Sequence, residues 1–352
     1  MASMKWIKFP DKRLVLNGLA WFDENSPKLW RLPKRLKKVV RPPIWELAEM
    51  PSGGRIRFTS DTTSLAIRVS YPSIGSTHNM CGIGKMGIAC YIDGNFWKPV
   101  LPEKTGKSEL AFFTGFTKKR REFVLYLPLY NPVDILAVGF DKSARISRPR
   151  SFIRSKPVVF YGTSITQGGC ASQAGLSYEA IIGRKLNIDF VNLGFSGEGR
   201  GEPEMAAALA EIDASCFVLD YAQNSPTADE LRERYDPFIQ TIRAAHPETP
   251  IVCIAPIFAT RNLHLKDQLR RFNDLSEVIR YAAMMRVLDG DRNMYLVEGL
   301  GLLSADDADG FVDGVHPNDL GFERMAKSLA PILVDVMELP RVRIGSKMRG
   351  TM

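Results

Sequence analysis

From about residue 156 onward, short apolar segments alternate with longer segments of helical periodicity, and this alternation constrains the fold more than any other feature of the chain. A strand that is apolar along its whole length is buried on both faces, as in a parallel sheet covered by helices on each side. We therefore expect an α/β domain with a parallel sheet. The predicted strands are 157–161, 188–193, 215–220, 250–255 and 293–298, and the predicted helices are 176–186, 202–211, 227–245, 264–288 and 319–336.

The first 145 residues follow a different pattern. Segments 55–59, 64–70 and 121–127 alternate polar and apolar residues, and turns that contain glycine or proline separate such segments. This alternation is typical of antiparallel strands with one face in a core and the other in solvent. We therefore predict an antiparallel β-sandwich. The predicted organisation is a sandwich domain over 1–145, a linker over 146–156, the α/β domain over 157–340 and a basic tail over 341–352.

The chain of 352 residues carries a formal net charge of +8. We interpret its basic clusters as solvated loops and tails, although they could also attract an acidic partner such as a uronic-acid polysaccharide. No nucleic-acid-binding motif accompanies them, so we expect no nucleic-acid partner. The clusters are Lys34, Arg35, Lys37, Lys38 and Arg41, then 118–121, 145–156 and 341–349.

Membrane and export signals are missing from this numbering. No apolar run approaches the roughly 18 residues that a membrane span requires. The first ten residues lack the apolar segment of a signal peptide. We expect a cytoplasmic protein, or a secreted or periplasmic one if a signal has been removed. The sequence leaves the oligomeric state open, a homo-oligomer included.

Cysteine and glycine patterns argue against a bound metal or cofactor. The five cysteines include no C-x-x-C pair, which speaks against a zinc site and a disulfide framework. Cys81 and Cys90 could pair, but a reducing compartment is the simpler interpretation. The glycine-rich segment 162–168 lacks the Lys-Ser/Thr of a phosphate loop, and 197–202 lacks the third glycine of a dinucleotide site. We therefore expect neither a cofactor nor a metal.

A serine follows the first strand of the predicted parallel sheet, in the string Tyr-Gly-Thr-Ser-Ile-Thr that ends at Thr166. Ligands of open α/β sheets collect beyond the carboxyl ends of the strands, so Ser164 stands where a nucleophile belongs. A serine hydroxyl needs a histidine to take its proton, and the histidine needs a carboxylate to fix its tautomer. Asp313 and His316 lie three residues apart in a loop after the last strand. We predict that these three residues form a catalytic triad.

Two further strand ends carry groups that could stabilise an oxyanion. Gly194 follows the second strand and could bring a backbone amide close to the substrate, and Asn224 follows the third strand and could add its side-chain amide. Taken singly, each could equally be an ordinary turn residue. The other histidines, His78, His246 and His264, have no comparable carboxylate partner, and we interpret them as surface or capping residues.

Taken in order, these blocks resemble those of the SGNH (GDSL-type) hydrolase family. Gly162 to Thr166 is similar to its nucleophile block, Gly194 to its second, Asn224 to its third and Asp313-x-x-His316 to its last. Thr163 departs from the usual aspartate, which is not a triad member in the family. The resemblance implies a flavodoxin-like three-layer α/β/α domain with a five-stranded sheet. It also implies that the amides of Ser164 and Gly194 and the Asn224 side chain form the oxyanion hole.

The N-terminal half resembles the first domain of a family subgroup that carries a jelly-roll-like sandwich. The resemblance rests on Leu29-Trp30-Arg31-Leu32-Pro33 and on residues 127–131, and only partly on 87–91. Members with this layout are similar to carbohydrate esterases that remove acetyl groups, though some transfer acyl groups instead.

The resemblance implies a serine esterase that hydrolyses a small acyl ester, most simply an acetyl ester of a carbohydrate, through an acyl-enzyme on Ser164. Two alternatives stay open. An acyltransferase would use the same triad with a sugar or polyketide hydroxyl as acceptor, and an inactive glycan-binding protein would work through its sandwich. The partner in each case is a small-molecule or oligosaccharide ester or glycan. Candidate substrate-binding residues are Phe195, Glu198, Arg200, Gln223, Phe258 and Arg261.

Overall fold

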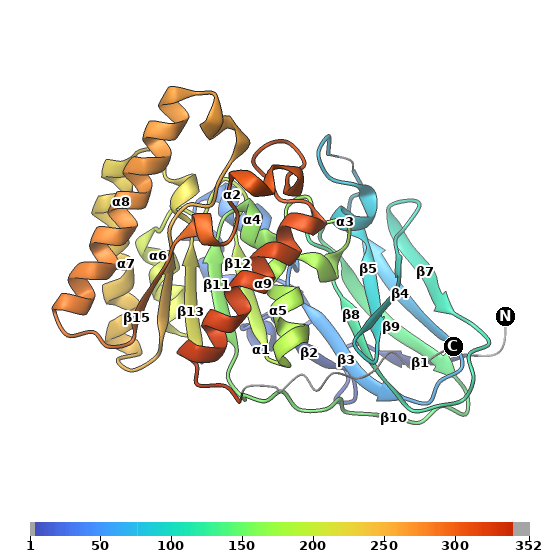
Figure 1. Ribbon diagram of the computed structural model, residues 1–352. Helices are drawn as coiled ribbons and strands as arrows, with labels where there is room; N and C mark the ends of the chain where they lie inside the picture. The colour runs from blue at the N-terminus through green and yellow to red at the C-terminus, as the bar shows by residue number, and fades with distance from the viewer. Residues whose placement is uncertain (1–3, 76, 341–352) are drawn as a thin grey trace, which may run out of the picture.

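The computed structural model describes residues 4–75 and 77–340, and Figure 1 shows a β-rich N-terminal half beside a layered α/β half. The predicted basic tail lies outside the described residues. None of the described helices is both long and apolar enough to cross a membrane.

Two antiparallel sheets form the N-terminal half, as the alternating pattern predicted. The first has the order β1 (Met4–Lys8), β9 (Asp134–Asp141), β4 (Leu65–Tyr71) and β7 (Gly106–Phe113). The second has the order β10 (Ile146–Ser147), β3 (Arg55–Ser60), β8 (Arg121–Tyr126), β5 (Ile88–Ile92) and β6 (Asn95–Val100), with β2 (Val15–Asn17) beside β3. Side chains from both sheets, including Phe58, Ile67 and Phe140, share one buried core. The sandwich fold is therefore confirmed.

Short helices also occur in the N-terminal half, where the sequence pattern predicted only strands. They are α1 (Phe22–Asn25), α2 (Pro42–Ala48), α3 (Gly82–Met86) and the 3₁₀ helix η1 (Lys34–Lys38). Trp21, Ile44 and Trp45, within or beside this helical segment, are buried in a core that they share with the α/β half. Residues 21–48 thus pack on the α/β domain although they precede most of the sandwich.

The C-terminal half contains a five-stranded parallel sheet in the order β12, β11, β13, β14, β15. This is the flavodoxin-like order 2-1-3-4-5, and it confirms the predicted fold class. The strands are β11 (Val158–Gly162), β12 (Phe190–Gly194), β13 (Cys216–Asp220), β14 (Ile251–Ile254) and β15 (Met294–Val297). The helices are α4 (Ser164–Gln167), α5 (Tyr178–Leu186), α6 (Pro203–Ala210), α7 (Ala228–Ala245), α8 (Lys266–Leu288) and α9 (Asp319–Val336). The 3₁₀ helices are η2 (Ala174–Leu176), η3 (Ala222–Asn224), η4 (Thr260–Leu263), η5 (Gly299–Gly301) and η6 (Ala305–Gly310).

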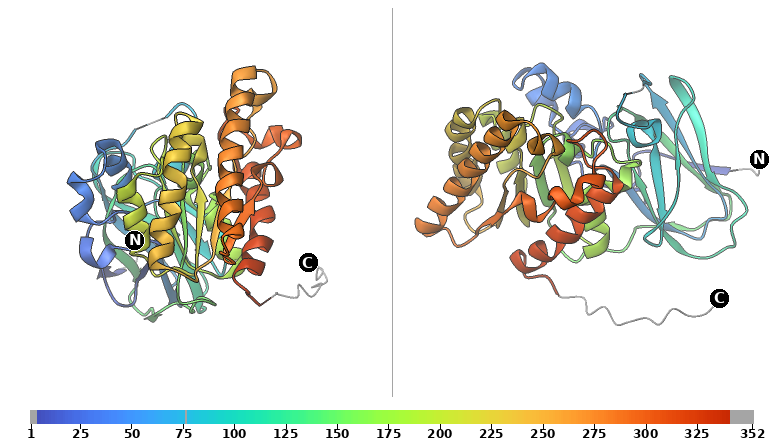
Figure 2. Two further views of the ribbon diagram at one scale, coloured as in Figure 1. Left: turned by 90° about the vertical axis from the view of Figure 1, so that its left-hand side faces the viewer. Right: turned by 45° about the horizontal axis from the view of Figure 1, so that its top comes forward.

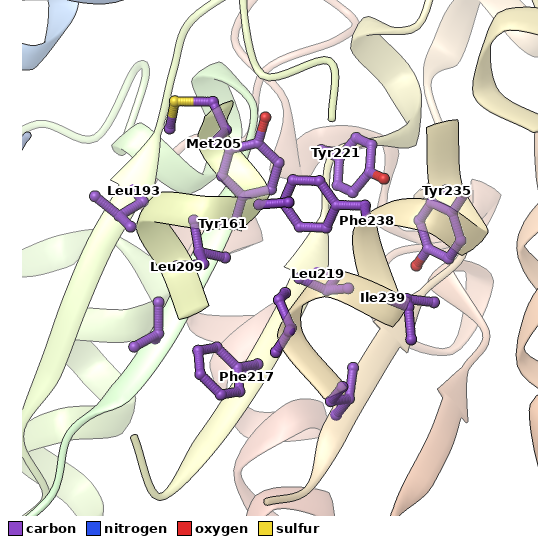
Figure 3. Packing of buried hydrophobic residues seen from close by; sticks show 14 of the residues in the cluster. Tyr161, Leu193, Met205, Leu209, Phe217, Leu219, Tyr221, Tyr235, Phe238 and Ile239 are labelled. Atoms are coloured by element: carbon purple, nitrogen blue, oxygen red, sulfur yellow. The ribbon is translucent and has the colours of Figure 1, made fainter. Parts of the chain in front are cut away.

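Helices cover both faces of this sheet, which explains why its strands are apolar throughout (Figure 2). Along β11, Val158 and Phe160 pack with residues of α5 and α9, whereas Val159 and Tyr161 pack with residues of α6 and α7. Figure 3 shows the core on the side of α6 and α7, in which Tyr161 lies beside Tyr221 and Phe238, and Tyr221 lies beside Tyr235. The Tyr161 and Phe238 rings stack with centroids 4.9 Å apart. The three layers hold the strand ends, and so the site, in fixed positions.

The segment between the two halves, predicted as a linker, contacts the sandwich. Residues 146–156 begin with β10, which pairs with β3 through Ile146 and Ser147. Further on, the Arg57 guanidinium carbon lies 3.8 Å from the centroid of the Phe152 ring.

Candidate active site

Ser164 begins the short helix α4 at the carboxyl end of β11, a strand beside the point where the strand order reverses. Thr163 caps this helix, and its Oγ1 accepts a hydrogen bond from the Ile165 amide at 3.2 Å. Gly162 permits the sharp turn, because a Cβ added there would lie 1.9 Å from Thr166 Oγ1 and 2.6 Å from a backbone oxygen of Asp220. Thr163 in place of the usual aspartate therefore has a structural use as a helix cap.

The structure brings the three predicted triad residues together. Ser164 Oγ lies 2.9 Å from His316 Nε2, and His316 Nδ1 lies 2.8 Å from Asp313 Oδ2. The His316 side chain is 24% exposed and the Asp313 side chain 30%, so both remain partly accessible to solvent. These distances are those at which a serine can pass its proton to a histidine that a carboxylate orients.

Asp313 is held as a carboxylate by several donors. Its Oδ1 accepts hydrogen bonds from the backbone amides of His316 at 2.8 Å and Val315 at 3.1 Å. Its Oδ2 accepts a bond from Asn79 Nδ2 at 2.9 Å, besides the one from the His316 ring. Burial raises the pKa of Asp313, but these hydrogen bonds outweigh burial and hold the pKa well below its usual range.

Asn79 belongs to the N-terminal half, as do two other residues that brace the nucleophile turn. Tyr130 Oη donates to the backbone oxygen of Ser164 at 3.1 Å, and Ser52 Oγ donates to the backbone oxygen of Gln167 at 2.7 Å. Sequence reasoning missed all three, because the contacts join segments far apart in the chain. The sandwich therefore contributes directly to the geometry of the triad.

Asn224 and Gly197 line the same cavity as Ser164. One hydrogen of Asn224 Nδ2 is directed at the Phe195 backbone oxygen, 3.2 Å away, which fixes the amide and leaves its second hydrogen for a ligand. Gly197 has a φ of +74°, a backbone conformation that favours glycine. Within the described part of the chain, its amide donates no hydrogen bond. Both groups are free to face a developing oxyanion.

Gly194 does not have the role that the sequence predicted. Its amide already donates to Asn192 Oδ1 at 2.9 Å, so it is unavailable to an oxyanion. A Cβ added at Gly194 would lie 2.2 Å from the Gln167 amide nitrogen, so this glycine allows β12 to pack against α4. The prediction for Gly194 is therefore wrong: Asn-Leu-Gly-Phe-Ser-Gly contains two glycines, and only the second, Gly197, lines the cavity.

The cavity beside Ser164 has a volume of about 350 Å³. Three of the six predicted substrate-binding residues, Gln223, Phe258 and Arg261, line it. Most of the remaining lining residues come from the loop after β14, from the start of α8 and from the triad loop. They include Ile257, Asn262, Gln268, Arg271, Phe272, Leu275 and Val315.

The other three predicted substrate-binding residues serve the framework. Phe195 is fully buried and packs under the Arg31 guanidinium, 4.6 Å from its ring centroid. Glu198 pairs with Arg41 and, at 3.5 Å, with Arg200. The Arg200 Nε also donates to the Gly197 backbone oxygen at 3.1 Å, so Arg200 supports the glycine turn from outside the cavity.

Possible metal ligands occur at the triad itself. Among the described residues, the one group with three ligand atoms within 4.8 Å of one another is Cys170, Asp313 and His316. Burial, followed by the negative charge of Asp313, raises the pKa of the Cys170 thiol to about 12. A protonated thiol is a poor ligand, and a metal here would occupy the histidine and carboxylate that Ser164 needs. All five cysteines are free, Cys81 and Cys90 included.

Comparisons with known proteins agree with this geometry. A protein from Bacteroides ovatus described as a GDSL-like lipase is 28% identical, with a TM-score of 0.87 over 96% of this chain and 98% of its own. The salicylyl-acyltransferase SsfX3 of a tetracycline biosynthetic pathway is 20% identical, with a TM-score of 0.82 over 96% and 98%. A family two carbohydrate esterase from Clostridium thermocellum, solved with cellohexaose, is 18% identical, with a TM-score of 0.63 over 82% and 94%.

At their low identity, the last two likenesses show the fold alone. No protein with a curated description matches the sequence. The profile for the N-terminus of Esterase_SGNH_hydro-type proteins matches residues 4–146. The profile of the GDSL-like Lipase/Acylhydrolase family matches residues 155–334, about half of the chain, and this stretch contains Ser164, Asn224, Asp313 and His316. The chain belongs to the GDSL-like lipase/acylhydrolase family of hydrolases.

Proposed function

We propose that the protein is a serine esterase that removes a small acyl group, such as acetyl, from a carbohydrate hydroxyl through an acyl-enzyme on Ser164. The observation that carries this proposal is the hydrogen-bonded series Ser164 Oγ, His316 Nε2, His316 Nδ1 and Asp313 Oδ2 at the wall of a cavity. Both links in the series are shorter than 3 Å.

The geometry supports the following sequence of steps. His316 Nε2 takes the proton of Ser164 Oγ as this oxygen bonds to the ester carbonyl carbon, and Asp313 stabilises the imidazolium that forms. The carbonyl oxygen becomes negative and faces the amides of Ser164 and Gly197 and the free hydrogen of Asn224 Nδ2. The bond to the alcohol then breaks, and His316 gives its proton to the departing oxygen. Water repeats the steps on the acyl-enzyme and releases the acid.

Two observations support a small ester on a sugar. The cavity of about 350 Å³ must hold the acyl group and part of the alcohol, which favours short acyl chains. The structural likeness extends to carbohydrate esterases, one of which was solved with cellohexaose. The same likeness supports an oligosaccharide as the physiological partner.

The test is hydrolysis of 4-nitrophenyl acetate and octanoate by the wild type, by Ser164→Ala and by Ser155→Ala, which changes an exposed serine that does not line the cavity. Without the nucleophile, kcat should fall roughly 10⁴-fold or more, with the unfolding temperature unchanged. Mass spectrometry of the wild type should detect an acetyl adduct on Ser164. Equal activity of Ser164→Ala and wild type would refute the proposal, and faster release of octanoate than acetate would refute the small acyl group.

An acyltransferase is the second candidate, because the likeness to the salicylyl-acyltransferase covers 96% of the chain. Transfer would use the same acyl-enzyme, with an acceptor hydroxyl in the place of water. Product analysis with candidate sugar acceptors separates the two reactions, since a transferase yields the acylated acceptor and a hydrolase the free acid. The intact triad speaks against the third possibility, an inactive glycan-binding protein.

A further inference from the structure

The cavity beside Ser164 contains positive charge that the reaction steps above do not use. Arg261 in η4 and Arg271 in α8 both line it. None of the lining residues given by the described structure is an aspartate or a glutamate. The lining also includes the apolar side chains of Ile257, Phe258 and Phe272.

Arg271 is half-buried, and its hydrogen bonds go to neutral groups. Its Nη2 donates to the backbone oxygens of Gln223 at 2.9 Å and Ser225 at 2.6 Å. Within the described residues, neither Arg271 nor Arg261 forms an ion pair. Burial, and then repulsion from Arg261, lowers the pKa of the Arg271 guanidinium. Keeping this positive charge half-buried without a counter-ion costs free energy, and a bound anion would offset part of that cost.

A second cavity, of about 300 Å³ at the boundary of the two domains, provides a contrast. It is also lined by arginines, but Arg55 forms an ion pair with Asp189, and Arg57 pairs with Glu122 at 3.0 Å. Acids therefore neutralise Arg55 and Arg57 in that cavity, whereas Arg184, which also lines it, donates to the backbone oxygens of Gly175 and Ala180. The arginines beside the nucleophile are left without a carboxylate partner.

We propose that Arg261 and Arg271 form an anion subsite that selects esters carrying a carboxylate. The inference rests on the proposed esterase function and narrows its substrate class, from sugar esters in general to esters of acidic sugars such as uronic acids. The planar guanidinium forks suit a carboxylate, which each can hold by two parallel hydrogen bonds. The apolar side chains of the cavity would contact the ring or the acyl chain of such an ester.

Kinetic comparison of matched esters tests the subsite. 4-Acetoxybenzoate and neutral 4-acetoxybenzamide place the charge on the alcohol, whereas 4-nitrophenyl hemisuccinate and neutral 4-nitrophenyl pentanoate place it on the acyl group. The wild type should prefer the anion in one pair by roughly 10- to 100-fold in kcat/KM, the range expected for a hydrogen bond to a charged group. The pair that shows the preference identifies which side of the ester meets the arginines. No preference in either pair would overturn the proposal.

The arginine variants localise the preference. Arg261→Gln and Arg271→Gln should each lower the anion-to-neutral ratio about tenfold, and Arg271→Lys should retain part of it. Arg270→Gln is the matched control, because Arg270 lies on the same helix, is 74% exposed and faces Asp267 at 3.9 Å. A ratio that falls equally in Arg270→Gln would mean that only net charge matters, which contradicts the subsite. Arg271→Gln removes two hydrogen bonds to backbone oxygens and could therefore impair folding. Arg261→Gln removes no hydrogen bond of the described structure, so it still tests the subsite if Arg271→Gln does not fold.

Binding separates failure of the subsite from failure of the esterase proposal. Calorimetry on Ser164→Ala would compare 4-acetamidobenzoate and N-phenylsuccinamate, stable amide analogues of the two anionic esters, with their neutral carboxamides. Tighter binding of one anion, lost in Arg261→Gln, supports the subsite even if no ester is hydrolysed. Hydrolysis of 4-nitrophenyl acetate without any anion preference in rate or binding supports the esterase and refutes the subsite.

Discussion

Asn79 links the sandwich to the triad through a single hydrogen bond to Asp313 Oδ2, the same atom that holds the His316 ring. We predict that Asn79→Ala lowers kcat for 4-nitrophenyl acetate about tenfold, because one hydrogen bond to a charged group is lost. KM should stay unchanged, since Asn79 does not line the cavity. Asn79→Asp should lower kcat further, because a second carboxylate would repel Asp313.

His78→Ala is the matched control for this positioning role. His78 is the exposed neighbour of Asn79, and the described structure gives it no hydrogen bond to the site. If Asn79→Ala and His78→Ala had the same kcat, Asn79 would have no part in catalysis. A change in KM instead of kcat would equally contradict the assignment.

The triad could be predicted from sequence at the scale of single residues, whereas its surroundings could not. Ser164 follows a recognisable strand, and the spacing of Asp313 and His316 is local. Asn79, by contrast, contacts Asp313 across 234 positions of sequence, and nothing in its own segment marks that contact. The choice between Gly194 and Gly197 depended on which amide is already bonded, which only the folded backbone determines.

At the scale of elements, buried acids beneath the site couple stability to pH. Burial raises the pKa of Glu179, at the start of α5, to about 8, and that of Asp220, at the end of β13, to about 7. Nearby Arg31 lowers the pKa of Glu179 without cancelling the effect of burial. When folding raises the pKa of a carboxyl, the folded protein binds the proton more tightly than the unfolded chain, and this stabilises the fold. The stabilisation is complete below the unfolded-state pKa and is lost as pH rises through the folded-state pKa.

We therefore predict that the free energy of unfolding falls by a few kcal/mol between about pH 4 and pH 8, at about 1.4 kcal/mol for each pKa unit separating the folded and unfolded states. Glu179→Gln should flatten this dependence, because its amide oxygen can still accept from Asn192 Nδ2 and carries no charge. Urea titrations over this pH range measure the effect. Glu233→Gln, at an exposed position of α7, should leave the slope as in the wild type. An unchanged slope in Glu179→Gln would show that Glu179 does not bind the proton.

Most elements of the α/β half were predictable, and those of residues 21–48 were not. The predicted strands and long helices end within two residues of the observed bounds, because burial on both sheet faces leaves a local apolar signature. The helix α2 has only seven residues and begins with two prolines, so it shows too little periodicity to reveal a buried face. Its apolar side chains find their core only through long-range packing on the α/β domain.

At the scale of the whole molecule, Arg31 joins the two halves. Its side chain is 1% exposed, and its Nε and Nη2 donate to the backbone oxygens of Met50 and Leu47, each at 2.8 Å. Its Nη1 donates to the Gly194 backbone oxygen at the carboxyl end of β12. Apolar side chains of residues 21–48, the segment that contains Arg31, also belong to the core of the α/β domain. The nucleophile turn, braced by Tyr130 and Ser52, therefore depends on the N-terminal half for stability as well as for position.

We predict that the full chain unfolds in one cooperative transition and that Arg31→Leu destabilises it by about 3–5 kcal/mol, because buried carbonyls at both ends of the contact lose a charged donor. Urea unfolding followed in parallel by tryptophan fluorescence and by loss of 4-nitrophenyl acetate hydrolysis would measure both effects. The control is Arg35→Leu, since Arg35 is 46% exposed and forms ion pairs only at the surface, where a pair contributes about 1 kcal/mol or less. Two separated transitions, with activity surviving the first, would mean that the α/β domain folds without the N-terminal half. A loss in Arg31→Leu no larger than in Arg35→Leu would show that the buried guanidinium does not hold the halves together.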